Sequence, residues 1–259
     1  IRDVYKRQVK YWLTFNEVNI SGMQPFFQAG VSQDPETIDD SVIAQIHHNM
    51  FVANSRAIEI IKNINSDLMV GCTTTIGPVY AMTPKPEDGL AQYFDTREMF
   101  FHTDVHVFGK YPKWKIKQLK DRGIKIDVTD EELSVIKNNT VDFVAYSYYQ
   151  SGVSESGSEE NEGDVNVISK KKNPELEVNE WNWVIDPVGL RIILNMVWDR
   201  YELPQFIVEN GVSKLEKLER DENGELTVKD NYRIEGLRDY LIQLNEAIAD
   251  GVEVIGYTN

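Results

Sequence analysis

The sequence has a single cysteine and no long hydrophobic run. Cys72 therefore cannot take part in an internal disulfide framework, and no cysteine pair is present for a zinc ribbon. No stretch approaches the ~18 consecutive apolar residues that a membrane span needs. The first eight residues are charged and lack an apolar core, so they are not a signal peptide, and we expect a cytoplasmic protein with no membrane partner. The chain also does not begin with Met, and we expect that its true start is missing.

Basic residues are scarce as well. The chain has 27 Lys and Arg against 42 Asp and Glu, a formal net charge of −15. Because no basic excess is available to neutralise phosphates, nucleic-acid binding is not expected. Hydrophobic residues make up 41% of the chain, which is typical of a globular protein. The length fits one α/β barrel domain over residues 1–259.

Short β-branched and aromatic runs alternate with amphipathic runs along the chain. The pattern predicts five strands, at residues 9–15, 67–74, 141–149, 205–208 and 252–257. It predicts helices at residues 37–64, 91–102, 113–122, 187–200 and 234–249, and a further helix after a capping box of Thr129 and Glu132. Asp186 and Pro187 are expected to begin the 187–200 helix, and Gly251 to follow the last one.

Strands separated by helices indicate a parallel sheet with right-handed crossovers. An open doubly wound sheet and a (β/α)8 barrel both satisfy this pattern. No Gly-rich phosphate turn follows the first predicted strand, which disfavours a dinucleotide-binding sheet. Residues 150–182 form a long insertion, either a disordered surface loop or a wall over a site. Its acidic run, residues 155–164, is interpreted as a solvated loop. Trp181 and Trp183 favour a wall over a site for the last part of the insertion.

Polar residues follow three of the predicted strands, at the end where a parallel barrel places its catalytic groups. They are Asn16 and Glu17 after the first strand, Ser147 to Tyr149 at the third, and Glu209 to Gly211 after the fourth. A carboxylate directly after a buried run is costly unless it is paired, so each glutamate is either catalytic or bound to a partner such as Arg.

Paired carboxylates are the requirement of glycoside hydrolysis. Glu17 and Glu209 lie 192 residues apart, so only the fold can bring them together. At a separation of about 5 Å and an effective dielectric constant of about 20, their repulsion is about 3 kcal/mol. This repulsion can keep one carboxyl protonated while the other is ionised.

The two glutamate segments, YWLTFNE at residues 11–17 and FIVENG at residues 206–211, resemble those of glycoside hydrolase family 1. Two further blocks match the family in the same order, FVAYSYY at residues 143–149 and WVIDPVGLR at residues 183–191. The resemblance covers residues 9–257. The bacterial 6-phospho-β-glucosidases are the nearest subgroup, judged by Ser147, where plain β-glucosidases usually have Asn, and by residues 102–112.

The resemblance implies a retaining hydrolase of 6-phospho-β-glucosides, with Glu17 as general acid/base and Glu209 as nucleophile. It implies that Asn16 bonds the sugar 2-hydroxyl and that Tyr149 donates its hydroxyl to Glu209. Trp183 is expected either to stack against sugar or to belong to the core. The partner is then a small-molecule β-glycoside, and no cofactor and no metal are expected.

The resemblance also implies an incomplete chain. The five predicted strands correspond to the fourth to eighth of the family barrel, so we expect an incomplete (β/α)8 TIM barrel that lacks its first three strands. Such a fragment is expected to be unstable and inactive by itself. A plain β-glucosidase or β-galactosidase, and a truncated carbohydrate-binding relative without activity, remain alternatives.

The remaining chemical residues have simpler interpretations. His47 and His48 lie on the long helix and are expected to pack against neighbours or face solvent. His102 and His106 have the i, i+4 spacing of helical metal ligands, but no third ligand is apparent, which disfavours a metal site. Cys72 is expected to be a buried apolar residue within a strand.

Overall fold

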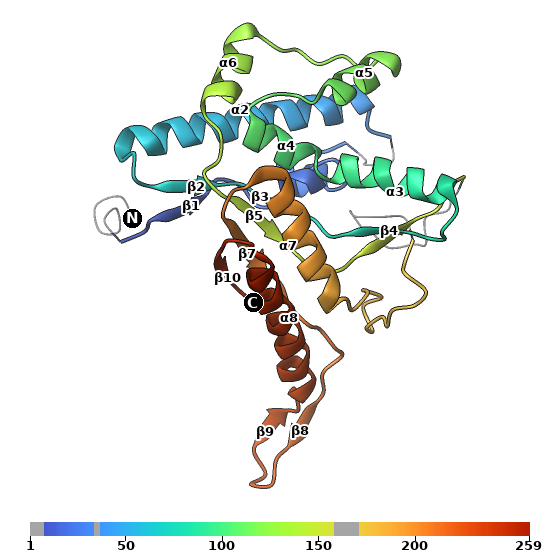
Figure 1. The fold of residues 1–259 in the computed structure, drawn as a ribbon. Coiled ribbons are helices and arrows are strands. Elements are labelled where there is room, and N and C mark those ends of the chain that lie inside the picture. The colour runs from blue at the N-terminus through green and yellow to red at the C-terminus, as the bar shows by residue number, and fades with distance from the viewer. Residues whose placement is uncertain (1–7, 34–36, 158–170) are drawn as a thin grey trace.

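The computed structural model describes residues 8–33, 37–157 and 171–259 of the chain (Figure 1). Its central feature is a parallel sheet in the order β10-β7-β5-β3, where β3 spans Thr73–Thr75, β5 Val144–Ser147, β7 Gln205–Glu209 and β10 Val254–Tyr257. The sheet continues through β2 (Met69–Gly71), which directly precedes β3 and pairs in parallel with β1 (Tyr11–Leu13). All five predicted strands are therefore present, and they are parallel as expected.

Helices connect these strands, as the sequence predicts. They are η1 (Val18–Ile20), α1 (Pro25–Ala29), α2 (Asp40–Ile64), α3 (Pro86–Met99), α4 (Phe101–Phe108), α5 (Lys113–Asp121), α6 (Asp130–Asn138), α7 (Pro187–Tyr201) and α8 (Asn231–Asp250). The long α2 lies along one side of the sheet, while α7 and α8 lie together on another (Figure 1).

Helix ends follow local capping chemistry. The Asp39 side chain accepts a hydrogen bond from the Ser41 amide, so α2 begins three residues after the predicted start at Thr37. The predicted capping box of Thr129 and Glu132 is present at α6, and Asp186 caps α7 ahead of Pro187. Gly251 follows α8 with a φ of 110°, a conformation that glycine adopts without strain.

One helix prediction was wrong. The segment expected as a single helix over residues 91–102 is two helices, α3 and α4, which meet at Phe100. Proline is tolerated in the first turn of a helix, so α3 begins at Pro86, well before the first apolar-periodic residue. Nothing in the local sequence explains the break at Phe100.

Two small sheets were not predicted. Strand β4 (Val79–Ala81) pairs in parallel with β6 (Gly152–Ser154), and β8 (Leu218–Arg220) forms an antiparallel hairpin with β9 (Leu226–Val228). The insertion expected as a loop over residues 150–182 therefore begins with a buried strand. Each of these strands has three residues, too few for a periodic pattern to show. Residues 158–170, which include most of the acidic run and Lys170, lie outside the described residues.

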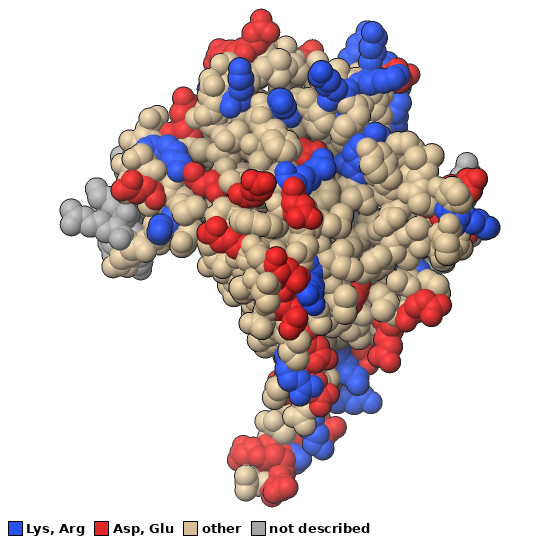
Figure 2. All heavy atoms as spheres, in the orientation of Figure 1, with Lys and Arg blue, Asp and Glu red and all other residues tan. Residues whose placement is uncertain are grey.

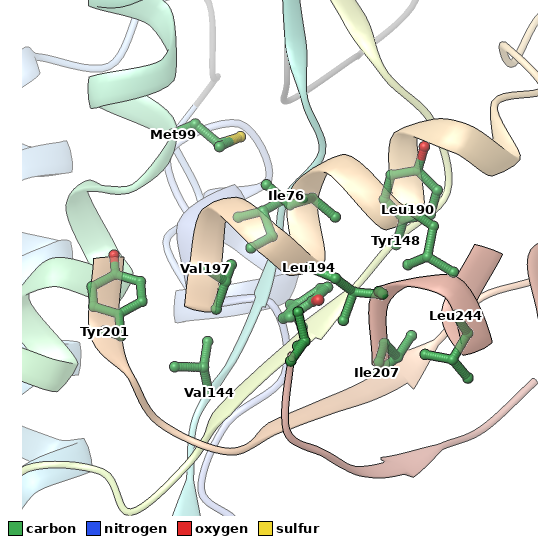
Figure 3. Close-up of a cluster of buried hydrophobic side chains, with 14 of the residues drawn as sticks. Ile76, Met99, Val144, Tyr148, Leu190, Leu194, Val197, Tyr201, Ile207 and Leu244 are labelled. Carbon is green, nitrogen blue, oxygen red and sulfur yellow. The ribbon is translucent and has the colours of Figure 1, made fainter. Parts of the chain in front are cut away.

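The main core lies between the sheet and the α7–α8 pair (Figure 3). Leu190 and Leu194 of α7 belong to the same buried cluster as Ile207 of β7 and Tyr148, and all four side chains are fully buried. Burial of each such side chain contributes about 2 kcal/mol. A second cluster packs α2 against the β1–β2 pair and contains Cys72. Cys72 is buried as predicted, at 5% exposed, but it lies between β2 and β3 and not within a strand. These two cores hold the carboxyl ends of the strands in place.

The sheet has open edges within the described residues. β1 pairs only with β2, and β10 only with β7. Tyr11 and Leu13 of β1 are 39% and 37% exposed, although a strand inside a parallel sheet is normally covered on both faces.

The surface is mixed in charge. Lysines gather over α5, whose sequence is KWKIKQLKD, while acidic side chains are spread over much of the visible face (Figure 2). Within the described residues, no helix combines the length and the apolar content needed to cross a membrane.

Candidate active site

Glu17 lies where β1 gives way to η1, in a strained conformation. Its φ and ψ of 39° and 52° are left-handed, a region that residues with a Cβ atom rarely adopt. Two hydrogen bonds hold η1 against the end of β3: Asn19 Nδ2 donates to the Thr75 carbonyl, and the Thr75 amide donates to Asn19 Oδ1, each at 2.8 Å. Such strain persists only where the surroundings fix it, and it clusters at functional sites.

Glu209 is the last residue of β7 and is half-buried. The Tyr149 hydroxyl donates to Glu209 Oε2 at 2.7 Å. The next residue, Asn210, ties three strand ends together, because its Nδ2 donates to the Tyr148 carbonyl at 2.7 Å and its Oδ1 accepts from the Tyr257 hydroxyl at 2.6 Å. The second carboxylate is therefore fixed by both side-chain and neighbouring backbone contacts.

The register of the strands places Thr75, Ser147 and Glu209 side by side at the carboxyl ends of β3, β5 and β7. Thr75 of β3 pairs with Ser147 of β5, and Ser147 pairs with Glu209 of β7. The second pairing follows a register shift between Tyr146 and Ser147. Irregular pairing of this kind is common next to active sites, where it redirects a side chain.

Electrostatics link the two carboxyls. Burial raises the pKa of Glu17, and the nearby charge of Glu209 raises it further, while the Ser147 side chain lowers it. Burial, the hydrogen bond to Glu209 and the charges of both glutamates raise the pKa of Tyr149. Tyr149 thus stays protonated and can donate a hydrogen bond, and the charges of both carboxylates act on it. All three groups therefore belong to one site.

The aromatic candidates lie beside this group. The ring centroids of Trp183 and Tyr149 are 5.2 Å apart, and Trp183 is 37% exposed, so it is not a core residue. Asn179 Oδ1 accepts hydrogen bonds from the amides of Trp181 and Trp183, which fixes the turn that carries both tryptophans. Trp181 is 53% exposed, and Asn16 is exposed next to Glu17.

Several residues at the site were given no role from the sequence. Asn19, Ser147, Asn210 and Tyr257 act through contacts between strands, which depend on register. Ser147, Asn210 and Tyr257 could be noticed only by their position at strand ends, and Asn19, which lies in η1, had no such signal.

The histidines lie between α2 and α4 and pack as expected for structural residues. His48 Nδ1 is 2.9 Å from the Tyr111 hydroxyl, and His106 Nδ1 is 2.9 Å from Asn54 Nδ2. The His47 and His102 rings meet edge to face at 4.4 Å. In the described ranges, no group of three or more His, Cys, Asp or Glu side chains is placed to hold a metal ion.

The profile of glycosyl hydrolase family 1 matches residues 1–259. The chain belongs to this family. A 6-phospho-beta-glucosidase of Clostridium longisporum is 43% identical over 255 residues, which are 98% of this chain and 54% of that protein. An aryl-phospho-beta-D-glucosidase of Bacillus subtilis is 40% identical over 256 residues, again 98% of this chain and 54% of the relative.

The family member described here thus spans about half the length of these curated relatives. A crystal structure of a beta-glucosidase from Exiguobacterium marinum superimposes with a TM-score of 0.78 at 24% identity, over 99% of this chain and 56% of that one. The likeness shows a shared fold. The predicted family is confirmed by the profile match and by the relatives at 40–43% identity.

Proposed function

We propose that this chain carries both catalytic carboxyls of a retaining β-glycoside hydrolase that cleaves 6-phospho-β-glucosides. The observation that supports it most directly is the convergence of Glu17 and Glu209 on Tyr149. One carboxyl is bound by the tyrosine hydroxyl at 2.7 Å, and burial raises the pKa of the other. Two carboxyls in unlike environments are what acid and nucleophile roles require.

In the proposed first step, Glu209 attacks the anomeric carbon and Glu17 gives its proton to the departing oxygen. The raised pKa of Glu17 supports this role, because the acid must still hold its proton when substrate binds. Tyr149 orients the attacking carboxylate. In the second step, Glu17 takes a proton from water, the water oxygen attacks the anomeric carbon, and the bond to Glu209 breaks.

Asn16 and Trp183 are proposed to contact the sugar. Asn16 is exposed beside Glu17 and would bond the 2-hydroxyl, a contact that strengthens in the transition state. Trp183 presents an exposed ring beside Tyr149, on which a sugar can stack. The two relatives at 40–43% identity are named as phospho-β-glucosidases, which supports a substrate phosphorylated at the 6-position.

We further propose that the chain forms the last five strands of a (β/α)8 barrel and lacks the first three. The described sheet has open edges at β1 and β10. The matched region covers only 54% of the length of the Clostridium longisporum relative. Below, the completed enzyme means this chain as part of a protein of the full length of the two relatives. The isolated chain is expected to be inactive, because a site open on one side cannot hold and desolvate a sugar.

The test of function uses the completed enzyme. We expect it to hydrolyse 4-nitrophenyl 6-phospho-β-glucoside far faster than the unphosphorylated glucoside, with the β-anomer as first product by NMR. Faster cleavage of the unphosphorylated sugar would identify a plain β-glucosidase. A folded enzyme that binds these compounds but cleaves none would be a non-catalytic relative.

The roles of the two glutamates are separated by azide. With Glu209→Gly, azide should restore turnover and yield an α-glycosyl azide, because the small anion replaces the nucleophile on the α face. With Glu17→Gly, an activated substrate still forms the glycosyl-enzyme, and azide should yield a β-glycosyl azide. The opposite pairing of products would reverse the assignment.

A further inference from the structure

Ser147 is a buried hydroxyl at the centre of the site, and its side chain approaches the Glu17 carboxyl without forming a well-aligned hydrogen bond. It is the last residue of β5 and is 0% exposed, and its Oγ makes no well-aligned hydrogen bond with the described residues. A buried polar group left unpaired costs about 1–3 kcal/mol, so native structures contain few of them. Three buried hydroxyls of the described residues lack a well-aligned hydrogen bond, those of Thr73, Ser147 and Ser151, and Ser147 is the one that lies beside the proposed catalytic carboxyls. Its place therefore points to use during the reaction.

The neighbours of Ser147 are the elements that carry the two carboxyls. On one side it pairs with Thr75, which Asn19 bonds to the helix headed by Glu17. On the other side it pairs with Glu209. The Ser147 side chain is close enough to the Glu17 carboxyl to lower its pKa, against the larger effect of burial.

A hydroxyl suits a carboxyl that changes its protonation state. Its O–H can donate to a carboxylate, and after rotation its lone pair can accept from a carboxylic acid. Glu17 passes through both states in the proposed mechanism. A fixed donor would favour the ionised state alone, and a fixed acceptor the protonated state alone.

We propose that Ser147 is a positioning residue for Glu17, whose hydroxyl turns to donate to the carboxylate that forms as Glu17 releases its proton to the leaving group. The proton passes from Glu17 to the glycosidic oxygen, while Ser147 keeps its own proton and forms no covalent bond. Ser147 thereby stabilises the charge that develops on Glu17 in the first step. This inference rests on the proposed function.

Acid catalysis matters most when the leaving group is poor, and this gives Ser147→Ala a distinctive signature in the completed enzyme. We expect kcat/KM for phenyl 6-phospho-β-glucoside to fall about tenfold, and for the 2,4-dinitrophenyl compound less than about twofold. The basic limb of the kcat/KM profile should also move to higher pH by about half to one unit, because the ionised form of Glu17 loses a hydrogen bond.

Ser151→Ala is the matched control. Ser151 is also 0% exposed, and its Oγ likewise makes no well-aligned hydrogen bond in the described part of the chain, but it lies beyond the end of β5. We expect this variant to keep both the leaving-group dependence and the pH profile of the parent. An equal change in Ser147→Ala and Ser151→Ala would show a general packing effect and overturn the proposal.

The possible failures are distinguishable. If the completed parent turns over no β-glycoside, the proposed function fails. If the parent is active but Ser147→Ala slows both substrates equally and leaves the basic limb in place, only the role of Ser147 fails. Unfolding of Ser147→Ala, seen as a large loss of Tm, would also contradict the proposal, because a hydroxyl without a well-aligned hydrogen bond should be dispensable for folding.

Discussion

At the scale of single residues, Glu17 combines a chemical task with an unfavourable backbone conformation. Glycine adopts its φ of 39° without strain, so Glu17→Gly should raise the free energy of unfolding of the completed enzyme by about 0.5–1 kcal/mol. The same change should remove turnover of phenyl 6-phospho-β-glucoside, because the proton donor is lost. Urea denaturation and steady-state kinetics measure the two effects.

Glu202 offers a control, because it also has a positive φ but lies outside the proposed active site. It has a φ of 50° at the C-terminal end of α7 and is exposed. Glu202→Gly should stabilise the enzyme by a similar amount and leave kcat/KM unchanged. If Glu17→Gly destabilises while Glu202→Gly stabilises, Glu17 makes contacts that outweigh its strain.

Tyr149 should act through its hydroxyl alone. In Tyr149→Phe, Glu209 loses a charge-assisted hydrogen bond of about 1.5–3 kcal/mol, so kcat/KM should fall about ten- to hundredfold. Tyr201→Phe loses a similar bond, 2.7 Å long to Asp104, and should lose stability without losing activity. Equal kinetics in Tyr149→Phe and the parent would remove Tyr149 from the mechanism.

The sequence predicts the proposed catalytic residues of this site better than the residues that hold them in position. Glu17 and Glu209 stand out because each follows a buried strand, and Tyr149 stands out through the resemblance to family 1. Ser147 pairs with Glu209 only after a register shift, which no local pattern reveals. Asn19 is important because it reaches Thr75 across 56 residues of sequence. Residues that act through register are visible only in the fold.

At the scale of elements, α2 and α4 meet through histidines that the fold keeps neutral. Burial lowers the pKa of His47 to about 4 and of His106 to about 3, and the pKa of His102 also lies well below its usual value. The nearby Lys115 ammonium adds to the effect on His47 and His102. In the unfolded chain these side chains take up protons below a pH of about 6.5.

Because the unfolded state binds more protons, stability should be full above pH 6.5 and should fall as the pH drops towards 4. Each histidine contributes up to about 2 kcal/mol of this loss between pH 7 and pH 5. His106→Asn keeps a polar partner for Asn54 but does not titrate. Its loss of unfolding free energy over this range, measured by urea denaturation, should be about 2 kcal/mol smaller than that of the parent. An identical pH dependence would show that His106 is protonated in both states or in neither.

Elements with a local chemical cause were predicted well. The capping box at α6, the Asp186 cap of α7 and the glycine after α8 are all set by residues within one turn. Elements that depend on a distant partner were missed, such as β4 and β6, which pair across 73 residues from Val79 to Gly152. Their three-residue length gives a hydrophobic pattern no room to repeat.

At the scale of the whole molecule, the open edges of the sheet set the behaviour that we expect of the isolated chain. An unpaired strand edge can pair with another chain, and natural barrels avoid this by closing. Within the described residues, β1 presents such an edge, with Tyr11 and Leu13 more than a third exposed. We therefore expect the 259-residue chain, expressed alone, to elute as aggregates on size exclusion and to show no glycosidase turnover, whereas the completed enzyme elutes as a discrete species and is active.

Two lysine substitutions locate the cause of this aggregation. Leu13→Lys places a charge on the open edge of β1 and should reduce aggregation of the isolated chain, because edge charges oppose strand pairing. Leu218→Lys adds the same charge at a residue that is 70% exposed on the β8–β9 hairpin, away from that edge, and should change little. If both variants aggregate like the parent, the β1 edge does not drive association. A discrete, active species from the unmodified chain would instead mean that five strands are enough to close the site around a sugar.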